Sequence, residues 1–178
     1  MIRLFAAIAI PNEIGEVLTR RQQGLPGARW RPVEAFHITL RFFGEIAESV
    51  ADDLDAELAG VSGEALTIVL EGVGAFEDGG DPHAVWAGVA ENDALKRLAA
   101  RCESAARRAG LPPDRRAWRP HVTLAYLRRA DPRRVAAWIQ GHNLTKSPPF
   151  TVGSFGLYSS HLGDEGASYR LERSYPLG

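Results

Sequence analysis

Two tetrapeptides of one type hold the residues in this chain that are best suited to chemistry. They are His37-Ile38-Thr39-Leu40 and His121-Val122-Thr123-Leu124, which start 84 positions apart in a 178-residue chain with five histidines. A chain of this composition would contain such a string roughly 0.02 times by chance. The repetition therefore indicates a common role.

Side chains in an extended strand alternate between its two faces. Each tetrapeptide then presents an imidazole and a hydroxyl on one face and two aliphatic side chains on the other. A neutral imidazole can take a proton from water while a protonated one gives a proton to a departing oxygen. Threonine hydroxyls can stabilise the charge on phosphate oxygens. If the polar faces meet, the pattern favours attack on phosphorus without a metal or nucleotide cofactor.

One His-x-Thr segment alone would more often be structural than catalytic, but the sequence around the motifs repeats as well. Trp30-Arg31-Pro32 precedes the first motif and Trp118-Arg119-Pro120 directly precedes the second, with 33–36 as extra residues in the first copy. We interpret this as an internal duplication. The expected pseudo-repeats cover residues 1–76 and 84–159, followed by a final strand at 168–175.

Hydrophobic periodicity and turn residues predict seven strands and four helices. The strands are expected at 3–10, 35–43, 65–76, 84–90, 119–127, 150–159 and 168–175, and the helices at 12–23, 47–60, 92–109 and 131–140. Ser49 and Asp52 are placed to cap the second helix, and Asp131 and Pro132 to start the fourth. We expect one α+β domain over residues 1–178. It would be bilobal, with two antiparallel sheets lining a central cleft and helices on their outer faces.

Composition narrows the setting of the protein. The single Cys102 excludes an intramolecular disulfide and lies on an apolar helical stripe. The N-terminal apolar run at 4–10 is too short to span a bilayer. Both features predict a cytoplasmic protein without a membrane partner, and no obligate protein partner is inferred.

The distribution of charge is uneven. The net charge of −1 argues against a protein that coats nucleic acid broadly, yet residues 101–134 hold ten arginines against three acidic residues. This basic region surrounds the second motif, where it would attract the end of a phosphate chain.

The remaining histidines and aromatic residues add less. His83, His142 and His161 follow turn residues and are expected in loops, and no zinc-ligand spacing is present. Three aromatic residues could stack on a terminal base, but at least two of them are expected in the core: Phe36, Phe43 and Trp118.

The stretches Phe36 to Glu45 and Arg119 to Leu124 resemble the two-histidine phosphoesterase superfamily, in particular the bacterial RNA 2′,3′-cyclic phosphodiesterases once called 2′-5′ RNA ligases. The likeness extends over nearly the whole chain. It implies hydrolysis of a terminal 2′,3′-cyclic phosphate to a 2′-phosphomonoester, with ATP-independent 2′-5′ ligation as the reverse reaction. The implied substrates are RNA ends or cyclic nucleotides, and no cofactor is implied.

The resemblance also implies roles for the motif residues. His37 would be the proton donor to the departing 3′ oxygen, and His121 would be the proton acceptor that activates water. Thr39 and Thr123 would bind the phosphate. The two motifs are too alike for the sequence itself to decide which histidine is the acid, so the exchanged assignment stays open.

One position departs from the family pattern. Many bacterial relatives carry an arginine five residues after the second histidine, where it can clamp phosphate, and this chain has Tyr126 there. Arg41, on the His37 face by strand parity, or Arg128, just beyond the strand, could replace it. Tyr126 could instead offer its hydroxyl.

Two alternatives to this enzyme remain. One is a module that binds RNA ends or cyclic nucleotides without turnover. The other is the same chemistry on a different cyclic phosphate or an ADP-ribose derivative.

Overall fold

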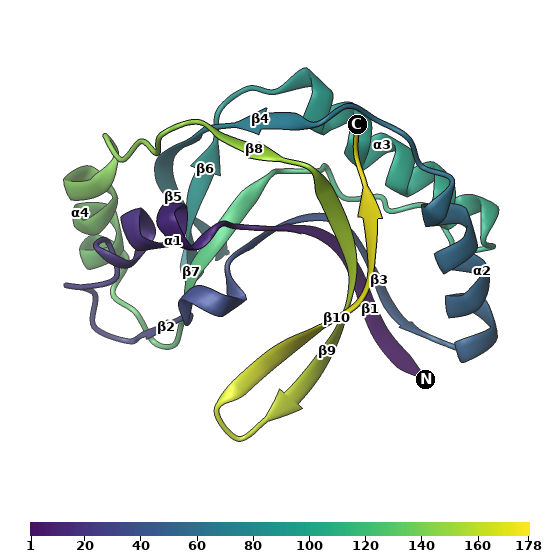
Figure 1. Cartoon of the computed structure of the whole chain (residues 1–178). Coiled ribbons are helices and arrows are strands. Elements are labelled where there is room, and N and C mark those ends of the chain that lie inside the picture. The colour runs from purple at the N-terminus through teal and green to yellow at the C-terminus, as the bar shows by residue number, and fades with distance from the viewer.

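Two four-stranded antiparallel sheets frame the molecule, and the computed structural model describes residues 1–178 (Figure 1). The β3 sheet has the strand order β10-β9-β1-β3, and the β7 sheet has the order β2-β7-β6-β5. Strand β3 begins at His37, and strand β7 begins at His121. The predicted α+β class with two antiparallel sheets is confirmed.

The strands are more numerous than predicted. The β3 sheet contains β1 (Ile2–Ala9), β3 (His37–Ile46), β9 (Ser154–Gly163) and β10 (Gly166–Pro176). The β7 sheet contains β2 (Ala28–Trp30), β5 (Leu70–Asp78), β6 (Asp81–Val89) and β7 (His121–Leu127). A separate two-stranded sheet pairs β4 (Leu66–Ile68) with β8 (Phe150–Val152).

Two predicted strands are each divided in the structure. The expected strand at 65–76 becomes β4 and β5, because the carbonyl of Val69 between them turns to accept a hydrogen bond from Ala90 N at 2.9 Å. The expected strand at 150–159 becomes β8 and β9, interrupted at Gly153. Periodicity alone cannot show that an extended segment leaves one sheet and enters another.

Helices cover the outer faces of the sheets (Figure 1). They are α1 (Asn12–Thr19), α2 (Glu48–Ala59), α3 (Asp93–Arg108) and α4 (Pro132–His142), with a single 3₁₀ turn, η1 (Val33–Ala35). Helix α3 packs on β3 and against α2, and α4 packs on β5 and β6. None of them is both long and apolar enough to cross a membrane.

The predicted helix starts are half right. Asp131 accepts a hydrogen bond from Arg133 N at 2.9 Å and Pro132 occupies the first turn, as expected. The capping box at Ser49 and Asp52 is wrong, because α2 begins after Ala47, which supplies no side-chain cap.

Each sheet takes strands from both halves of the sequence. In the β3 sheet, β1 pairs with β3 on one side and with β9 on the other. In the β7 sheet, β6 pairs with β7 on one side and with β5 on the other. The first half of the chain begins with β1 in the β3 sheet, yet its strand β5 lies in the β7 sheet. The second half begins with β6 in the β7 sheet, yet its strand β9 lies in the β3 sheet.

A β-bulge follows the threonine of each motif. The pairing of β3 with β1 shifts between Thr39 and Arg41, which leaves Leu40 as an extra residue. The pairing of β7 with β6 shifts in the same way at Leu124. Beyond a bulge, the alternation of side chains between the two faces is reversed.

Candidate active site

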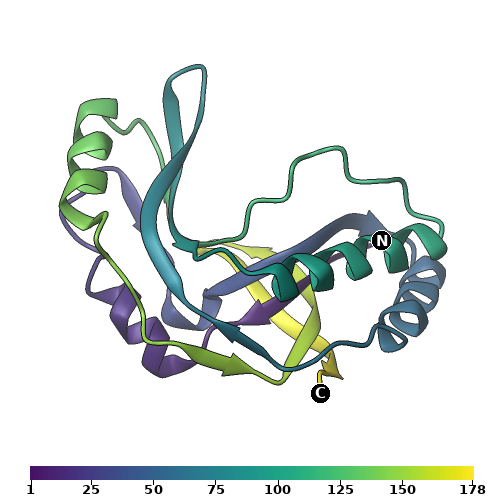
Figure 2. The same cartoon turned by 90° about the horizontal axis from the view of Figure 1, so that it is seen from above.

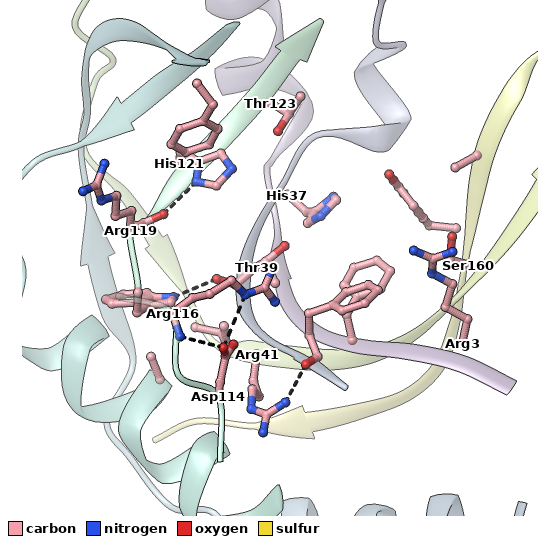
Figure 3. Close-up of a pocket in the computed structure, with 18 of the residues that line it drawn as sticks. Arg3, His37, Thr39, Arg41, Asp114, Arg116, Arg119, His121, Thr123 and Ser160 are labelled. Carbon is pink, nitrogen blue, oxygen red and sulfur yellow. Dashed lines mark hydrogen bonds and ion pairs between the residues drawn. The ribbon is translucent and has the colours of Figure 1, made fainter. Parts of the chain in front are cut away.

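A cavity of about 990 Å³ lies between the two sheets, and both motifs line it (Figure 3). His37 and Thr39 enter it from β3, and His121 and Thr123 enter it from β7. The aliphatic residues of both motifs are buried in the core. The structure thus brings together the four side chains that strand alternation places on the polar faces.

The backbone fixes the tautomer of both imidazoles in the same way. Nδ1 of His37 lies 2.8 Å from the carbonyl oxygen of Ala35, and Nδ1 of His121 lies 2.7 Å from that of Arg119. Since a carbonyl can only accept, each Nδ1 carries the hydrogen of its bond. In each neutral ring, Nε2 is then the atom free to accept a proton.

Burial makes both imidazoles harder to protonate. Burial lowers the pKa of His37 to about 4, against the opposing effect of the hydrogen bond to Ala35. The charges of His121 and Arg31 lower the pKa of His37 further. Burial also lowers the pKa of His121, where the hydrogen bond to Arg119 opposes it. Both rings are therefore neutral at pH 7 in the free protein.

The two bulges decide which residues follow the threonines into the cavity. Phe42 and Tyr126, each five residues after a histidine, both line it. The bulge places Arg41 on the side of the strand away from His37, where it is buried and pairs with Glu103, although the cavity extends far enough to reach it. Its guanidinium also donates to the carbonyl of Pro112 at 2.7 Å. The expectation that Arg41 lies on the His37 face is wrong, because strand parity does not hold across a bulge.

The other two candidates for the phosphate clamp differ in position. Arg128 is exposed and is not among the residues that line the cavity. Tyr126 lines the cavity and remains 46% exposed. Burial and the neighbouring Tyr169 raise the pKa of Tyr126, so its hydroxyl stays protonated and can donate.

The aromatic residues proposed from the sequence separate as expected. Phe36 and Phe43 are buried in the core. Trp118 lines the cavity and donates a hydrogen bond from Nε1 to the carbonyl of Thr39 at 3.0 Å. This bond ties the 111–120 segment to the first motif; Figure 2 shows the segment arching away from α3.

Aromatic rings that the sequence analysis did not single out contact the imidazoles. Phe76 of β5 meets His121 edge-on at 4.8 Å between ring centroids, and Tyr169 of β10 meets His37 edge-on at 5.0 Å. Phe5 lies 4.9 Å from His37. These residues come from strands without a motif, so the sequence carried no signal for them.

The remaining histidines lie outside the cavity. The structure places His83 on β6, His142 at the end of α4 and His161 on β9, so their assignment to loops is wrong. They extend the strands and the helix beyond the predicted boundaries. No three His, Cys, Asp or Glu side chains gather as a metal site.

This fold and cleft match one family. The sequence pattern of the 2′-5′ RNA ligase superfamily matches residues 10–164, so the chain belongs to this superfamily. An RNA 2′,3′-cyclic phosphodiesterase of Archaeoglobus fulgidus is 30% identical over 172 residues, which cover 95% of this chain and 97% of that protein. A protein of the same name from Escherichia coli is 32% identical over 126 residues, covering 68% and 70%. The predicted family is confirmed.

Solved structures agree with the fold. The protein TT0787 of Thermus thermophilus has a TM-score of 0.81 at 24% identity and covers 98% of this chain and 97% of its own. E. coli LigT in complex with 3′-AMP has a TM-score of 0.78 at 27% identity, with 99% and 98% covered.

Proposed function

We propose that this protein hydrolyses terminal 2′,3′-cyclic phosphates of RNA to 2′-phosphomonoesters. The observation that carries the proposal is the pair of imidazoles in one cavity, each with Nδ1 held by a backbone carbonyl and Nε2 available for proton transfer. The names of the full-length relatives support the substrate class, and E. coli LigT has been crystallised with 3′-AMP.

The proposed reaction needs one acid and one base. Nε2 of His121 takes a proton from water as the water oxygen bonds to phosphorus, and Nε2 of His37 gives a proton to the 3′ oxygen as its bond to phosphorus breaks. Thr39 and Thr123 donate hydrogen bonds to the non-bridging oxygens as their charge increases. A 5′-hydroxyl in place of water would join two RNA ends by a 2′-5′ bond.

The low pKa of His37 sets a condition on this assignment. In the free protein His37 carries no proton at pH 7, so the anionic substrate must raise its pKa before it can act as the acid. A phosphate beside the ring does this, because an adjacent negative charge favours the imidazolium. Protonation is then coupled to substrate binding.

The test is incubation with a short oligoribonucleotide that ends in a 2′,3′-cyclic phosphate, without added metal or nucleotide. The expected product carries a 2′-phosphate and a 3′-hydroxyl, identified by phosphorus NMR. A product with only a 3′-phosphate would contradict the placement of His37 at the 3′ oxygen. Binding without turnover would identify a binding module instead.

A further inference from the structure

Six cationic side chains line the cavity, and three of them are neutralised. Those three pair with carboxylates: Arg41 with Glu103, Lys96 with Glu91, and Arg116 with Asp114. The other three, Arg3, Arg31 and Arg119, take part in none of the eight ion pairs of the structure. A phosphate in the cavity would meet uncompensated charge only from these.

The three free arginines differ in where their charge lies. The guanidinium of Arg119 points away from both imidazoles in Figure 3. Arg3 lies over the ring of Phe42, 5.3 Å from its centroid. Arg31 is the arginine whose charge contributes to the lowered pKa of His37. Geometry agrees, because the guanidinium of Arg31 lies 5.5 Å from the ring centroid of Tyr169, whose ring lies 5.0 Å from that of His37.

The four extra residues of the first repeat explain why Arg31 and Arg119 differ in position. Residues 33–36 contain η1 and separate Arg31 from His37, whereas Arg119 lies two residues before His121. Arg31 instead follows β2, where its N–H donates to the carbonyl of Leu124 at 2.8 Å. It thus reaches the cavity from the β7 sheet, opposite His37.

Neighbouring groups hold the side chain of Arg31 but do not use all of its hydrogen-bond donors. Its guanidinium lies 5.8 Å from the ring centroid of Tyr126 and 5.5 Å from that of Tyr169. Nη2 donates one hydrogen bond to the carbonyl of Ala167 at 2.8 Å. Since an arginine has five N–H groups in a planar fork, donors remain for an oxyanion.

We propose that Arg31, held between Tyr126 and Tyr169, binds the phosphate of the cyclic substrate and so serves as the cationic clamp of this site. The inference rests on the proposed phosphodiesterase function. It places three parts of the chain around one phosphate: β2, the bulged end of β7, and the β9–β10 hairpin.

This position also explains how substrate binding can protonate His37. A phosphate oxygen on the Arg31 guanidinium compensates the positive charge that disfavours the imidazolium. The same phosphate supplies a negative charge beside the ring. Arg31 therefore links occupation of the anion site to the acid form of His37.

The test compares Arg31→Ala and Arg31→Lys with Arg29→Ala. Arg29 lies two residues earlier, on β2, is exposed and does not line the cavity, so Arg29→Ala removes the same charge at a neighbouring position outside the site. Loss of a hydrogen-bonded charge predicts that Arg31→Ala lowers kcat/KM for the cyclic phosphate about 10- to 100-fold and weakens competitive inhibition by inorganic phosphate. Arg31→Lys should recover part of both, and Arg29→Ala should change neither.

A second readout separates phosphate binding from a structural role. Arg31→Ala should raise the pKa of His37 in an NMR titration, because it removes a nearby positive charge, and Arg29→Ala should not. If kcat/KM falls while the phosphate inhibition constant and the His37 pKa stay at wild-type values, Arg31 only anchors the hairpin through Ala167, and the proposal is wrong. Values within twofold of wild type in every assay would also overturn it.

Failure of the proposed function gives a different result. A wild-type protein that does not hydrolyse the cyclic phosphate contradicts the enzyme assignment. Calorimetric titration of wild type and Arg31→Ala with inorganic phosphate would still decide whether Arg31 forms an anion site.

Discussion

At the scale of single residues, the two histidines are not equivalent although their motifs are. Both are buried and both donate from Nδ1 to a carbonyl two residues earlier. Only His37 has an arginine whose charge disfavours its protonated form. The first proton taken up by the free pair should therefore go to His121, and in the proposed mechanism substrate binding must move the proton to His37.

The pH dependence of turnover should show this. Above pH 6.5 both rings of the free protein are mostly neutral and little acid is present, whereas below about 4 His37 is charged and can no longer leave the pair with a free base once His121 is protonated as well. We expect kcat/KM to be highest between these values and to fall as the pH rises above them. The optimum of kcat should lie at higher pH, since bound phosphate raises the pKa of both groups. A kcat/KM that is flat from pH 5 to 8 would contradict the two-histidine mechanism.

Substitution of the motif residues should follow the same division of roles. His37→Ala and His121→Ala should each lower kcat about 10² to 10⁴-fold while the protein stays folded. The double variant should lose much less than the product of the two losses, because both groups serve one reaction step. Thr39→Val and Thr123→Val should cost less than either histidine. Steady-state kinetics measures these losses, and circular dichroism is the control for folding. Near wild-type turnover in either histidine variant would identify that histidine as structural.

The four motif residues could be predicted because the signal is local. The alternation of side chains along a strand is enough to place a histidine and a threonine two residues apart on the same face. The repeated motif indicates that the chain has two such faces. Arg41 was misplaced because a bulge reverses that alternation after Leu40. Arg31 was missed as a site residue because its place depends on β2 pairing beside β7, a contact between segments far apart in the sequence.

At the scale of elements, β3 has a glycine at the second irregularity in its pairing with β1. Gly44 pairs with Leu4 and has a φ of 77°, in the region that disfavours side chains. A Cβ there would meet no atom within 4 Å, so any cost of a side chain comes from the backbone alone. The strand leaves the cavity at this point and continues toward α2.

Two glycine substitutions should therefore have opposite signs. Gly44→Ala should lower the free energy of unfolding by about 1 kcal/mol, because alanine is strained at positive φ. Gly141→Ala is the matched control. It lies in α4 with open space around its Cβ and should raise the free energy of unfolding by about 0.5 to 1 kcal/mol. Urea denaturation measures both, and equal effects would show that backbone conformation at Gly44 is not limiting.

At the scale of the whole molecule, neither half of the chain can complete a sheet. The β3 sheet needs β9 and β10, and the β7 sheet needs β2 and β5 from the first half. The β4–β8 pair joins the halves again outside the two sheets. The two lobes of the cleft are thus each built from both ends of the sequence.

Cleavage of the β5–β6 turn tests this. Gly79 and Gly80 both have positive φ and open surroundings, so a break there removes no packing. Fragments 1–79 and 80–178 should each fail to unfold cooperatively alone and should regain the native circular dichroism spectrum when mixed. A cooperative thermal transition in fragment 1–79 by itself would show that the exchanged strands are dispensable.

The exchange of strands also sets an order in time when the chain is made on a ribosome. Strand β1 emerges first and finds β3 soon afterwards, but its other edge stays unpaired until β9 has been synthesised. An open, apolar strand edge is a site for aggregation during that interval. Tyr169, which contacts His37, arrives only with the last strand. A nascent chain can therefore carry both motifs long before it has a cleft, and a prematurely terminated product should be inactive.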